Sequence, residues 1–145
     1  MPMRIALDEA EEALRRGEVP VGAVITTGAG TVLARARNRT LELHDPTAHA
    51  ELLAIREAAA TRANQRLTDC DIYVSLEPCA MCAAAISFAR LRRLYFGAPD
   101  LKMGAVDNGP RFFHQHTCHH RPEVYGGIAE RHAADLLRSF FSAKR

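Results

Sequence analysis

Four residues in two short runs carry the clearest chemical signal in this sequence. His49 and Glu51 lie two positions apart, and Cys79 and Cys82 form a Cys-x-x-Cys pair directly after Pro78. One imidazole and two thiolates can hold a zinc ion, and three protein ligands leave the fourth tetrahedral position open for water. Because an open zinc site lowers the pKa of that water toward neutrality, the pattern predicts a catalytic metal site.

Glu51 is predicted to act beside the metal and not as its ligand. Its position two residues after His49 lets the carboxylate reach the water without binding the zinc ion. The alternative is a closed, structural zinc site that is completed by Cys70, Cys118 or a nearby histidine. That alternative gives no function to Glu51 or to Pro78, so the open site is the preferred interpretation.

Length and composition predict one globular domain over residues 1–145. The chain has 48% hydrophobic and 25% charged residues, and no apolar run approaches the length of a membrane span. The N-terminal residues contain no apolar signal core, so we expect a cytoplasmic protein without a membrane partner. The four cysteines include one metal-type pair, which fits a reducing compartment better than a disulfide framework.

Hydrophobic periodicity and turn residues predict helices that alternate with strands. Helices are expected over residues 3–16, 48–61, 78–89 and 128–144, and strands over residues 21–26, 31–37, 72–76 and 94–97. The stretch from 98 to 121 contains glycines and prolines and is interpreted as mostly loop. Strands that alternate with helices favour a three-layer α/β/α domain.

Both pairs of site residues are expected at helix N-termini. His49 and Glu51 fall in the first turn of the second helix, and Cys79 and Cys82 lie one turn apart on one face of the third. The positive end of a helix dipole stabilises thiolates, and two such helices can point at one metal ion. The third helix has almost no charge before Arg90, so we expect the sheet or another subunit to bury it.

Longer runs of family-like sequence surround the metal-binding residues. They are Gly17–Val24, Asn38–Arg39, His44–Glu51, Tyr73–Cys82 and Phe96–Lys102, with Phe140–Phe141 near the C-terminus. Over nearly its whole length the chain resembles the cytidine deaminase superfamily, whose members carry His-x-Glu and Pro-Cys-x-x-Cys, and within it the bacterial tRNA-specific adenosine deaminases. The resemblance implies a cytidine-deaminase-like fold with a central, largely five-stranded mixed sheet. Residues 107–120 differ from the best-known members.

The resemblance also implies an activity and its partners. The expected reaction is hydrolysis of the wobble adenosine of a tRNA anticodon stem-loop to inosine, by a homodimer with one Zn²⁺ per subunit. Arginine tRNA is the expected substrate. Glu51 would take a proton from the water, pass it to N1 of the purine and later deliver a proton to the departing ammonia.

Five further residues are expected to bind the substrate on the same resemblance. Asn38 would contact the target nucleotide, Val21 would pack against the base, and backbone groups near Ala50 would help to hold the purine. Asp100 and Lys102 lie in a loop after the fourth strand, at the expected mouth of the pocket. A carboxylate there can accept a hydrogen bond from a ribose 2′-hydroxyl, which deoxyribose lacks.

Two other functions stay open at the level of the sequence. A deaminase of free guanine, cytosine or cytidine would keep the same zinc site, although the full-length match and the loop with Asp100 and Lys102 argue against it. A zinc-stabilised RNA-binding module without catalysis would have no use for Glu51 beside the metal. Ammonia release from free nucleosides, compared with release from a tRNA anticodon stem-loop, tests the first alternative. RNA binding by zinc-loaded protein without inosine formation would support the second.

Two clusters of polar residues have both a functional and a plain interpretation. A basic set could bind the phosphates of an anticodon stem or simply form a solvated face. Its members are Arg90, Arg92, Arg93, Lys102 and Arg111. A histidine set could indicate a second metal site, but chance clustering in an exposed loop is the preferred interpretation. Its members are His114, His116, His119 and His120.

Overall fold

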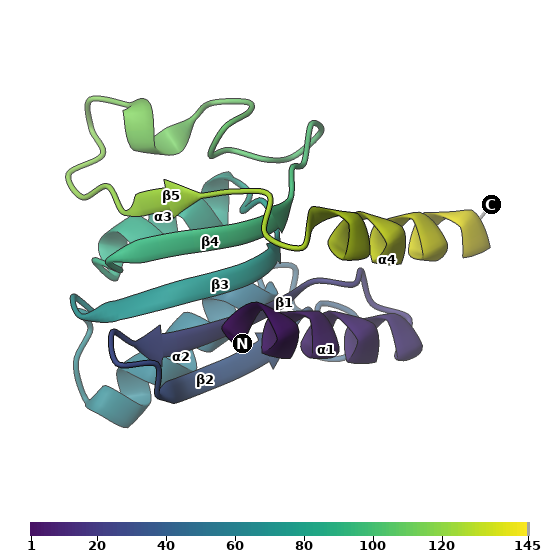
Figure 1. Cartoon of the computed structure of the whole chain (residues 1–145), viewed down its shortest axis with the longest axis horizontal. Coiled ribbons are helices and arrows are strands. Elements are labelled where there is room, and N and C mark those ends of the chain that lie inside the picture. The colour runs from purple at the N-terminus through teal and green to yellow at the C-terminus, as the bar shows by residue number, and fades with distance from the viewer. Residues whose placement is uncertain (145) are drawn as a thin grey trace.

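A computed structural model of the chain describes residues 1–144, in which four α-helices and five strands form one α/β body (Figure 1). In chain order the elements are α1 (Pro2–Arg15), β1 (Gly22–Thr27), β2 (Val32–Arg37), α2 (Ala50–Arg62), β3 (Cys70–Leu76), α3 (Ala80–Phe88), β4 (Arg93–Ala98), the 3-10 helix η1 (Phe112–His114), β5 (Glu123–Tyr125) and α4 (Glu130–Ala143). All eight elements expected from the sequence are present, and the sequence did not locate β5 or η1.

The five strands form a mixed sheet in the order β2-β1-β3-β4-β5. β1 runs antiparallel to both of its neighbours, whereas β3, β4 and β5 run parallel to one another. Leu76 at the end of β3 pairs with Ala98 at the end of β4, so the chain leaves both strands at the same edge of the sheet. This edge brings the Cys79 turn next to the loop that contains Asp100.

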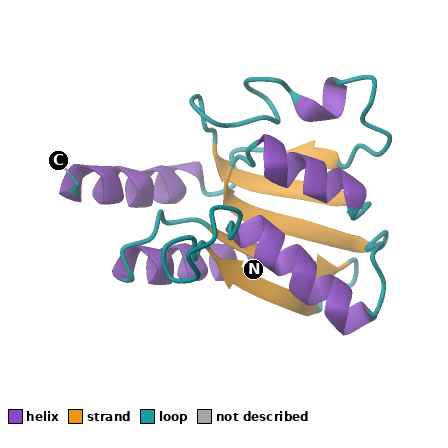
Figure 2. Cartoon of the chain, turned by 180° about the vertical axis from the view of Figure 1, so that it is seen from behind, coloured by secondary structure: helices purple, strands orange, loops and turns teal. Residues whose placement is uncertain are grey.

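Helices cover both faces of the sheet and confirm the expected three layers. α1 and α4 lie side by side on one face, while α2 and α3 lie on the other, as the two opposite views show (Figures 1 and 2). α1 packs closely on β1 because Gly22 has no side chain there. A Cβ atom at Gly22 would lie 2.0 Å from the carbonyl oxygen of Ala6 in α1.

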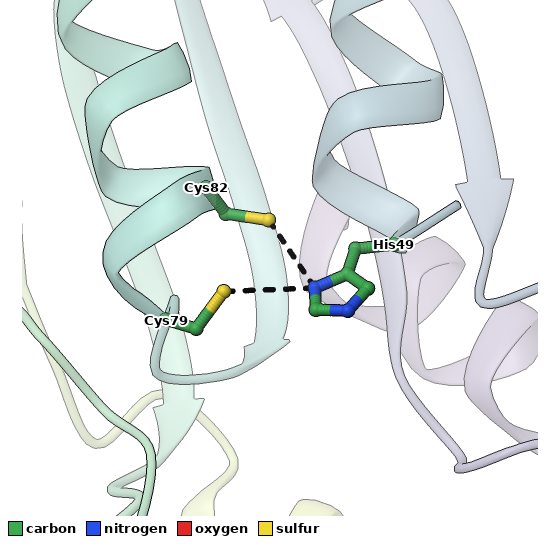
Figure 3. A group of neighbouring side chains, drawn as sticks. All are labelled: His49, Cys79 and Cys82. Atoms are coloured by element: carbon green, nitrogen blue, oxygen red, sulfur yellow. Dashed lines mark hydrogen bonds between the residues drawn. The ribbon is translucent and has the colours of Figure 1, made fainter. Parts of the chain in front are cut away.

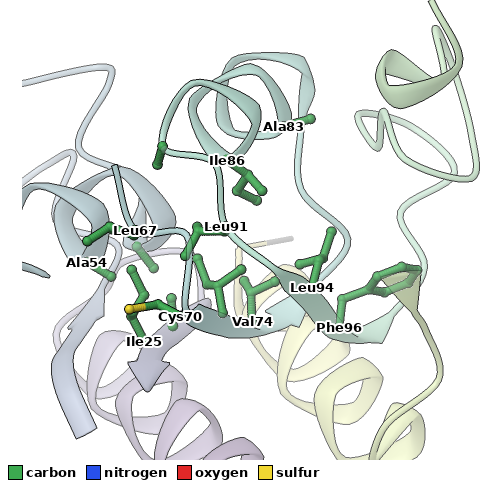
Figure 4. Packing of buried hydrophobic residues seen from close by; sticks show 14 of the residues in the cluster. Ile25, Ala54, Leu67, Cys70, Val74, Ala83, Ile86, Leu91, Leu94 and Phe96 are labelled. Atoms are coloured by element: carbon green, nitrogen blue, oxygen red, sulfur yellow. The ribbon is translucent and has the colours of Figure 1, made fainter. Parts of the chain in front are cut away.

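The main hydrophobic core lies between the sheet and the pair α2 and α3 (Figure 4). Ile25 of β1, Val74 of β3 and Leu94 of β4 have no exposed surface, and Ile86 of α3 packs onto them. The alanines of α2 and α3 let these two helices approach the sheet closely, which fixes the direction of their N-termini. Within residues 1–144, no helix has the length and apolar character needed to cross a membrane.

Candidate active site

The three predicted zinc ligands come together where α2 and α3 begin (Figure 3). His49 and Cys79 are the residues that precede the first turns of α2 and α3, and both have extended backbone angles. The sequence had placed both inside their helices. Cys82 lies in the first turn of α3 and is buried. Two helix N-termini therefore present one imidazole and two thiols to a common point.

The spacing of the ligand atoms fits a tetrahedral zinc ion. His49 Nδ1 lies 3.6 Å from Cys79 Sγ and 3.5 Å from Cys82 Sγ, and the three ligand atoms all lie within 4.8 Å of one another. Zn–N bonds of about 2.0 Å and Zn–S bonds of about 2.3 Å at tetrahedral angles set nitrogen and sulfur about 3.5 Å apart. The residues therefore fit zinc with three protein ligands and one open position.

The surroundings of the two cysteines shift their pKa values in opposite directions. Hydrogen bonding from Cys82 lowers the pKa of Cys79 to about 4, against the opposing effect of burial, and His49 also lowers it. The neighbouring Cys79 sulfur and burial raise the pKa of Cys82 above its ordinary value. The contact with Cys79 raises the pKa of His49. Because zinc binds thiolates and neutral imidazole, its binding releases protons from this group.

Glu51 lies in the first turn of α2, next to the ligands but outside the set that can hold the metal. Its side chain is 4% exposed, and burial raises its pKa to about 7. A carboxyl group with a pKa near neutrality can both accept and donate a proton at the working pH. These two properties are the ones that the expected proton-transfer role of Glu51 requires.

A cavity of about 280 Å³ opens directly over His49, Cys79 and Glu51. Three of the five predicted substrate-binding residues, Val21, Asn38 and Asp100, line it. The other lining residues, which the sequence analysis did not single out, are Val19, Thr40, Leu76, Glu77 and Met103. They come from loops and strand ends that the fold brings together, and no local spacing predicts that they line one cavity.

Asn38 and Ala50 are linked to each other in the structure. The Ala50 N–H donates a hydrogen bond of 2.9 Å to Oδ1 of Asn38, which is buried. This bond holds the Asn38 side chain over the start of α2. A direct contact between Ala50 and a purine stays a prediction.

The loop with Asp100 and Lys102 lies at the rim of the cavity. Asp100 Oδ1 accepts hydrogen bonds from the N–H groups of Lys102 and Met103, at 3.1 and 3.0 Å, so Asp100 caps its own turn. Lys102 lines a neighbouring apolar hollow instead of the central cavity, together with Leu101 and Phe141. The two hollows share Asp100 and Met103 and are therefore adjacent.

The alternatives for the other cysteines and the histidines receive no support. Among residues 1–144, the one group of side chains spaced for a metal ion is the set formed by His49, Cys79 and Cys82. Cys118 Sγ instead donates to the carbonyl oxygen of His120, at 3.1 Å, and Cys70 is buried in the core. A closed zinc site and a second metal site in the histidine loop therefore lack ligands in this part of the chain.

The predicted basic surface is only partly available for phosphates. Arg92 forms an ion pair with Asp71 at 2.7 Å, and Arg93 forms one with Glu123 at 3.3 Å. Their guanidinium groups are thus neutralised locally, which the sequence could not show because the partners are distant in the chain.

Comparison with known proteins identifies the class first. The sequence model described as the cytidine and deoxycytidylate deaminase zinc-binding region matches residues 2–98, which contain the three ligands and Glu51. The chain is therefore a zinc-dependent deaminase. A tRNA-specific adenosine deaminase of Agrobacterium fabrum is 58% identical over 143 residues, which cover 99% of this chain and 93% of the relative. The chain belongs to the family of tRNA-specific adenosine deaminases.

Solved structures agree with this assignment. One comes from biochemical and structural studies of A-to-I editing by tRNA:A34 deaminases at the wobble position of transfer RNA. It is 57% identical, has a TM-score of 0.92, and the match covers 94% of this chain and 98% of that chain. The guanine deaminase of Nitrosomonas europaea, with 23% identity and a TM-score of 0.82 over 97% of this chain and 83% of its own, shares the fold.

Proposed function

We propose that this protein hydrolyses the wobble adenosine of a tRNA anticodon to inosine, with one zinc ion per subunit. The observation that carries the proposal is the buried Glu51, which lies outside the three-ligand set yet lines the same cavity. A structural zinc site has no use for such a carboxylate. The identity to tRNA-specific adenosine deaminases along almost the entire chain supports the substrate.

Glu51 carries the proton transfers of the proposed reaction. Zinc held at this site supplies an activated water. Glu51 accepts a proton from the attacking water and donates it to N1 of the adenine as the new oxygen–C6 bond forms. It then takes the second proton of the water and delivers it to the amino group, which leaves as ammonia when the C6–N bond breaks. Water and adenosine thus become inosine and ammonia.

The remaining cavity residues orient the nucleotide in this proposal. Val21 packs against the base, and the Asn38 NH2 group donates to the target nucleotide. Asp100 faces the ribose beside it, and Lys102 contacts the RNA from the adjacent hollow. Leu101 and Phe141 are exposed in that hollow, so they offer apolar surface to the unstacked bases of an anticodon loop.

The open rim favours a nucleotide in RNA over a free nucleobase. A free base gains most from a closed pocket, whereas a base that projects from a loop needs a mouth through which its ribose and neighbours can pass. Here a second hollow lies next to the cavity over Glu51, and Asp100 and Met103 line both. This adjacent hollow offers room for the neighbours of the target base, which supports a polynucleotide substrate.

Sequencing of total tRNA after incubation with the zinc-loaded protein tests the proposal. We expect adenosine-to-inosine conversion at the wobble position, with arginine tRNA as the main substrate. Conversion at other positions alone, or RNA binding without any inosine, would contradict the proposal. The second result would support a non-catalytic RNA-binding module.

We further propose that the protein is a cytoplasmic homodimer with one domain in each subunit. Support comes from the outer face of α2 and α3, where Leu52, Ile55 and Ala85 line an apolar groove beside Phe88. The Phe88 side chain is 79% exposed in the single chain. Sedimentation should therefore give twice the 16.0 kDa monomer mass, and Phe88→Glu should shift the protein toward monomer. A wild-type monomer at micromolar concentration would contradict the dimer.

A further inference from the structure

Glu77 is a buried carboxylate at the edge of the cavity, and its side chain receives five hydrogen bonds. Oε1 accepts from the Asp100 N–H at 3.0 Å and from the Asn108 side-chain amide at 2.7 Å. Oε2 accepts from the N–H groups of Val106, Asp107 and Asn108 at 3.0, 2.9 and 3.1 Å. Glu77 is 2% exposed, and no basic side chain of residues 1–144 forms an ion pair with it.

All five donors belong to the segment 100–108, and Asp100 and Met103 of this segment line the cavity. Glu77 itself follows β3 directly and lies two residues before Cys79. Its carboxylate therefore ties the loop with Asp100 and Met103 to the turn that carries a zinc ligand. A backbone bond of 2.9 Å from Ala105 N–H to the Pro78 carbonyl runs beside it.

The segment is shaped to close over this carboxylate. A Cβ atom at Gly104 would lie 2.6 Å from Cδ of Glu77 and 2.4 Å from the carbonyl oxygen of Asp100. Glycine at position 104 is thus required for the loop to approach Glu77 as closely as it does. The contact therefore depends on two residues: Glu77 supplies the buried acceptor, and Gly104 leaves room for it.

The chemistry of the contact calls for a carboxylate and excludes its neutral analogue. Five N–H donors converge on two oxygens, and a buried polar group is stable only when such bonds satisfy it. A glutamine at position 77 has one oxygen and one NH2 group. Whichever way its amide turns, at least two donors of the segment face another donor and lose their acceptor.

We infer that Glu77 is a positioning residue for substrate recognition: it sets the place of Asp100 and Met103 over Glu51 and thereby determines how well the nucleotide is held. The inference rests on the proposed function, because it takes the loop that Glu77 holds to be the one against which the nucleotide binds. Glu77 touches no reacting atom in this role. Its effect on the reaction passes through the loop.

The test combines Glu77→Gln with Asp100→Ala in a double-mutant cycle on a tRNA anticodon stem-loop. We expect Glu77→Gln to retain one zinc ion per subunit and to lower kcat/KM about tenfold or more, mainly by raising KM. In the Glu77→Gln background, Asp100→Ala should have little further effect, because the loop is already displaced. Full additivity of the two substitutions would overturn the inference.

Glu18→Gln is the matched control. Glu18 is also 2% exposed and accepts the N–H groups of Leu41 and Glu42, at 3.1 and 2.9 Å, in the loop whose Thr40 lines the cavity. If Glu77→Gln lowered activity only by reducing stability, the double-mutant cycles of Glu18→Gln and of Glu77→Gln with Asp100→Ala would give the same result. We expect Glu18→Gln to be additive with Asp100→Ala, because the hydrogen bonds of Glu18 go to residues 40–42 and not to the loop with Asp100.

Two further measurements test the inference even if Glu77→Gln does not fold. If Glu77→Gln does not fold, Asn108→Ala removes only the 2.7 Å side-chain bond and should raise KM about threefold in the same direction. Binding of the stem-loop should weaken in parallel when measured in a Glu51→Gln background, without turnover. Unchanged binding there would overturn the inference, whereas absence of inosine with wild-type protein would instead overturn the proposed function.

Discussion

The metal-binding floor of the cavity and its rim are built in different ways. The floor consists of His49, Cys79 and Cys82, which two helix N-termini hold in place through local backbone structure. The rim consists of two loops, residues 38–45 and 99–108, and each is fastened to a buried glutamate from elsewhere in the chain. The chemistry therefore depends on short runs of sequence, whereas the shape that selects a substrate depends on long-range hydrogen bonds.

Loss of a metal ligand is the largest expected effect and tests the floor. Cys79→Ser and Cys82→Ser should each lose zinc and all detectable inosine formation, because three protein ligands leave no reserve. Metal content by mass spectrometry and inosine in the anticodon stem-loop are the measurements. Cys70→Ala is the matched control, since this buried thiol lies outside the ligand set and should keep its zinc. Full zinc occupancy in either ligand variant would contradict the assignment.

Glu51→Gln should separate the chemistry from the metal. We expect one zinc ion per subunit and turnover reduced at least about a hundredfold, because the proton carrier is lost while the ligands stay intact. Glu57→Gln, on the exposed face of the same helix, should leave both zinc and turnover near wild type. Turnover above a few per cent of wild type in Glu51→Gln would reject the proton-transfer role.

Much of the floor could be predicted from the sequence because its information is local. The pattern around His49 and Cys79 predicted the three residues that lie together in the structure, and it placed Glu51 beside them. The hydrophobic periodicity predicted four helices and four strands. The fifth strand, Glu123–Tyr125, was not located because it is a three-residue edge strand without a buried side chain. Its position is set by pairing with β4, which no local pattern reports.

The rim could not be predicted in the same way. Glu77 stands beside the Pro-Cys motif, but nothing in its neighbourhood shows that its partners lie at positions 100–108. Likewise, Arg92 and Arg93 were candidates for phosphate binding until their ion pairs with Asp71 and Glu123 became visible. Contacts between residues 21 to 31 positions apart decide these roles, and the sequence alone does not record them.

Asp100→Asn sharpens the comparison with a smaller effect at the rim. Asparagine keeps Oδ1, so the bonds from Lys102 and Met103 should persist and the turn should remain folded. The lost charge should weaken acceptance of a ribose 2′-hydroxyl and relieve repulsion of a DNA phosphate, each by about 1 kcal/mol. The two contributions add, so the ratio of kcat/KM on an RNA hairpin to that on the matching DNA hairpin should fall about thirtyfold. An unchanged ratio in a folded variant would leave Asp100 with its capping role alone.

The smallest expected effect is a change in stability at Asp69, whose exposed carboxylate contrasts with the buried glutamates that hold the rim. Hydrogen bonds from Arg62 lower the pKa of Asp69 to about 2. A folded-state pKa below the unfolded value stabilises the protein above about pH 4, and that contribution disappears as the pH falls to 2. Because the Asp69 side chain is 59% exposed, Asp69→Asn should cost less than about 1 kcal/mol at pH 7.

Thermal unfolding of wild type and Asp69→Asn across this pH range is the measurement. The difference in Tm should be small at pH 7 and should vanish near pH 2, while inosine formation stays unchanged. A difference that grows toward acid pH, or a loss of activity, would show that Asp69 does more than pair with Arg62.

Ammonia release from competing substrates tests the central claim most directly. Zinc-loaded protein is given, in separate reactions, a tRNA anticodon stem-loop with adenosine at the wobble position, the same stem-loop with guanosine there, free adenosine, free guanine and free cytidine. We predict ammonia from the first substrate and none above background from the others. Faster release from a free base or nucleoside than from the adenosine stem-loop would contradict the proposal that this site deaminates adenosine in tRNA.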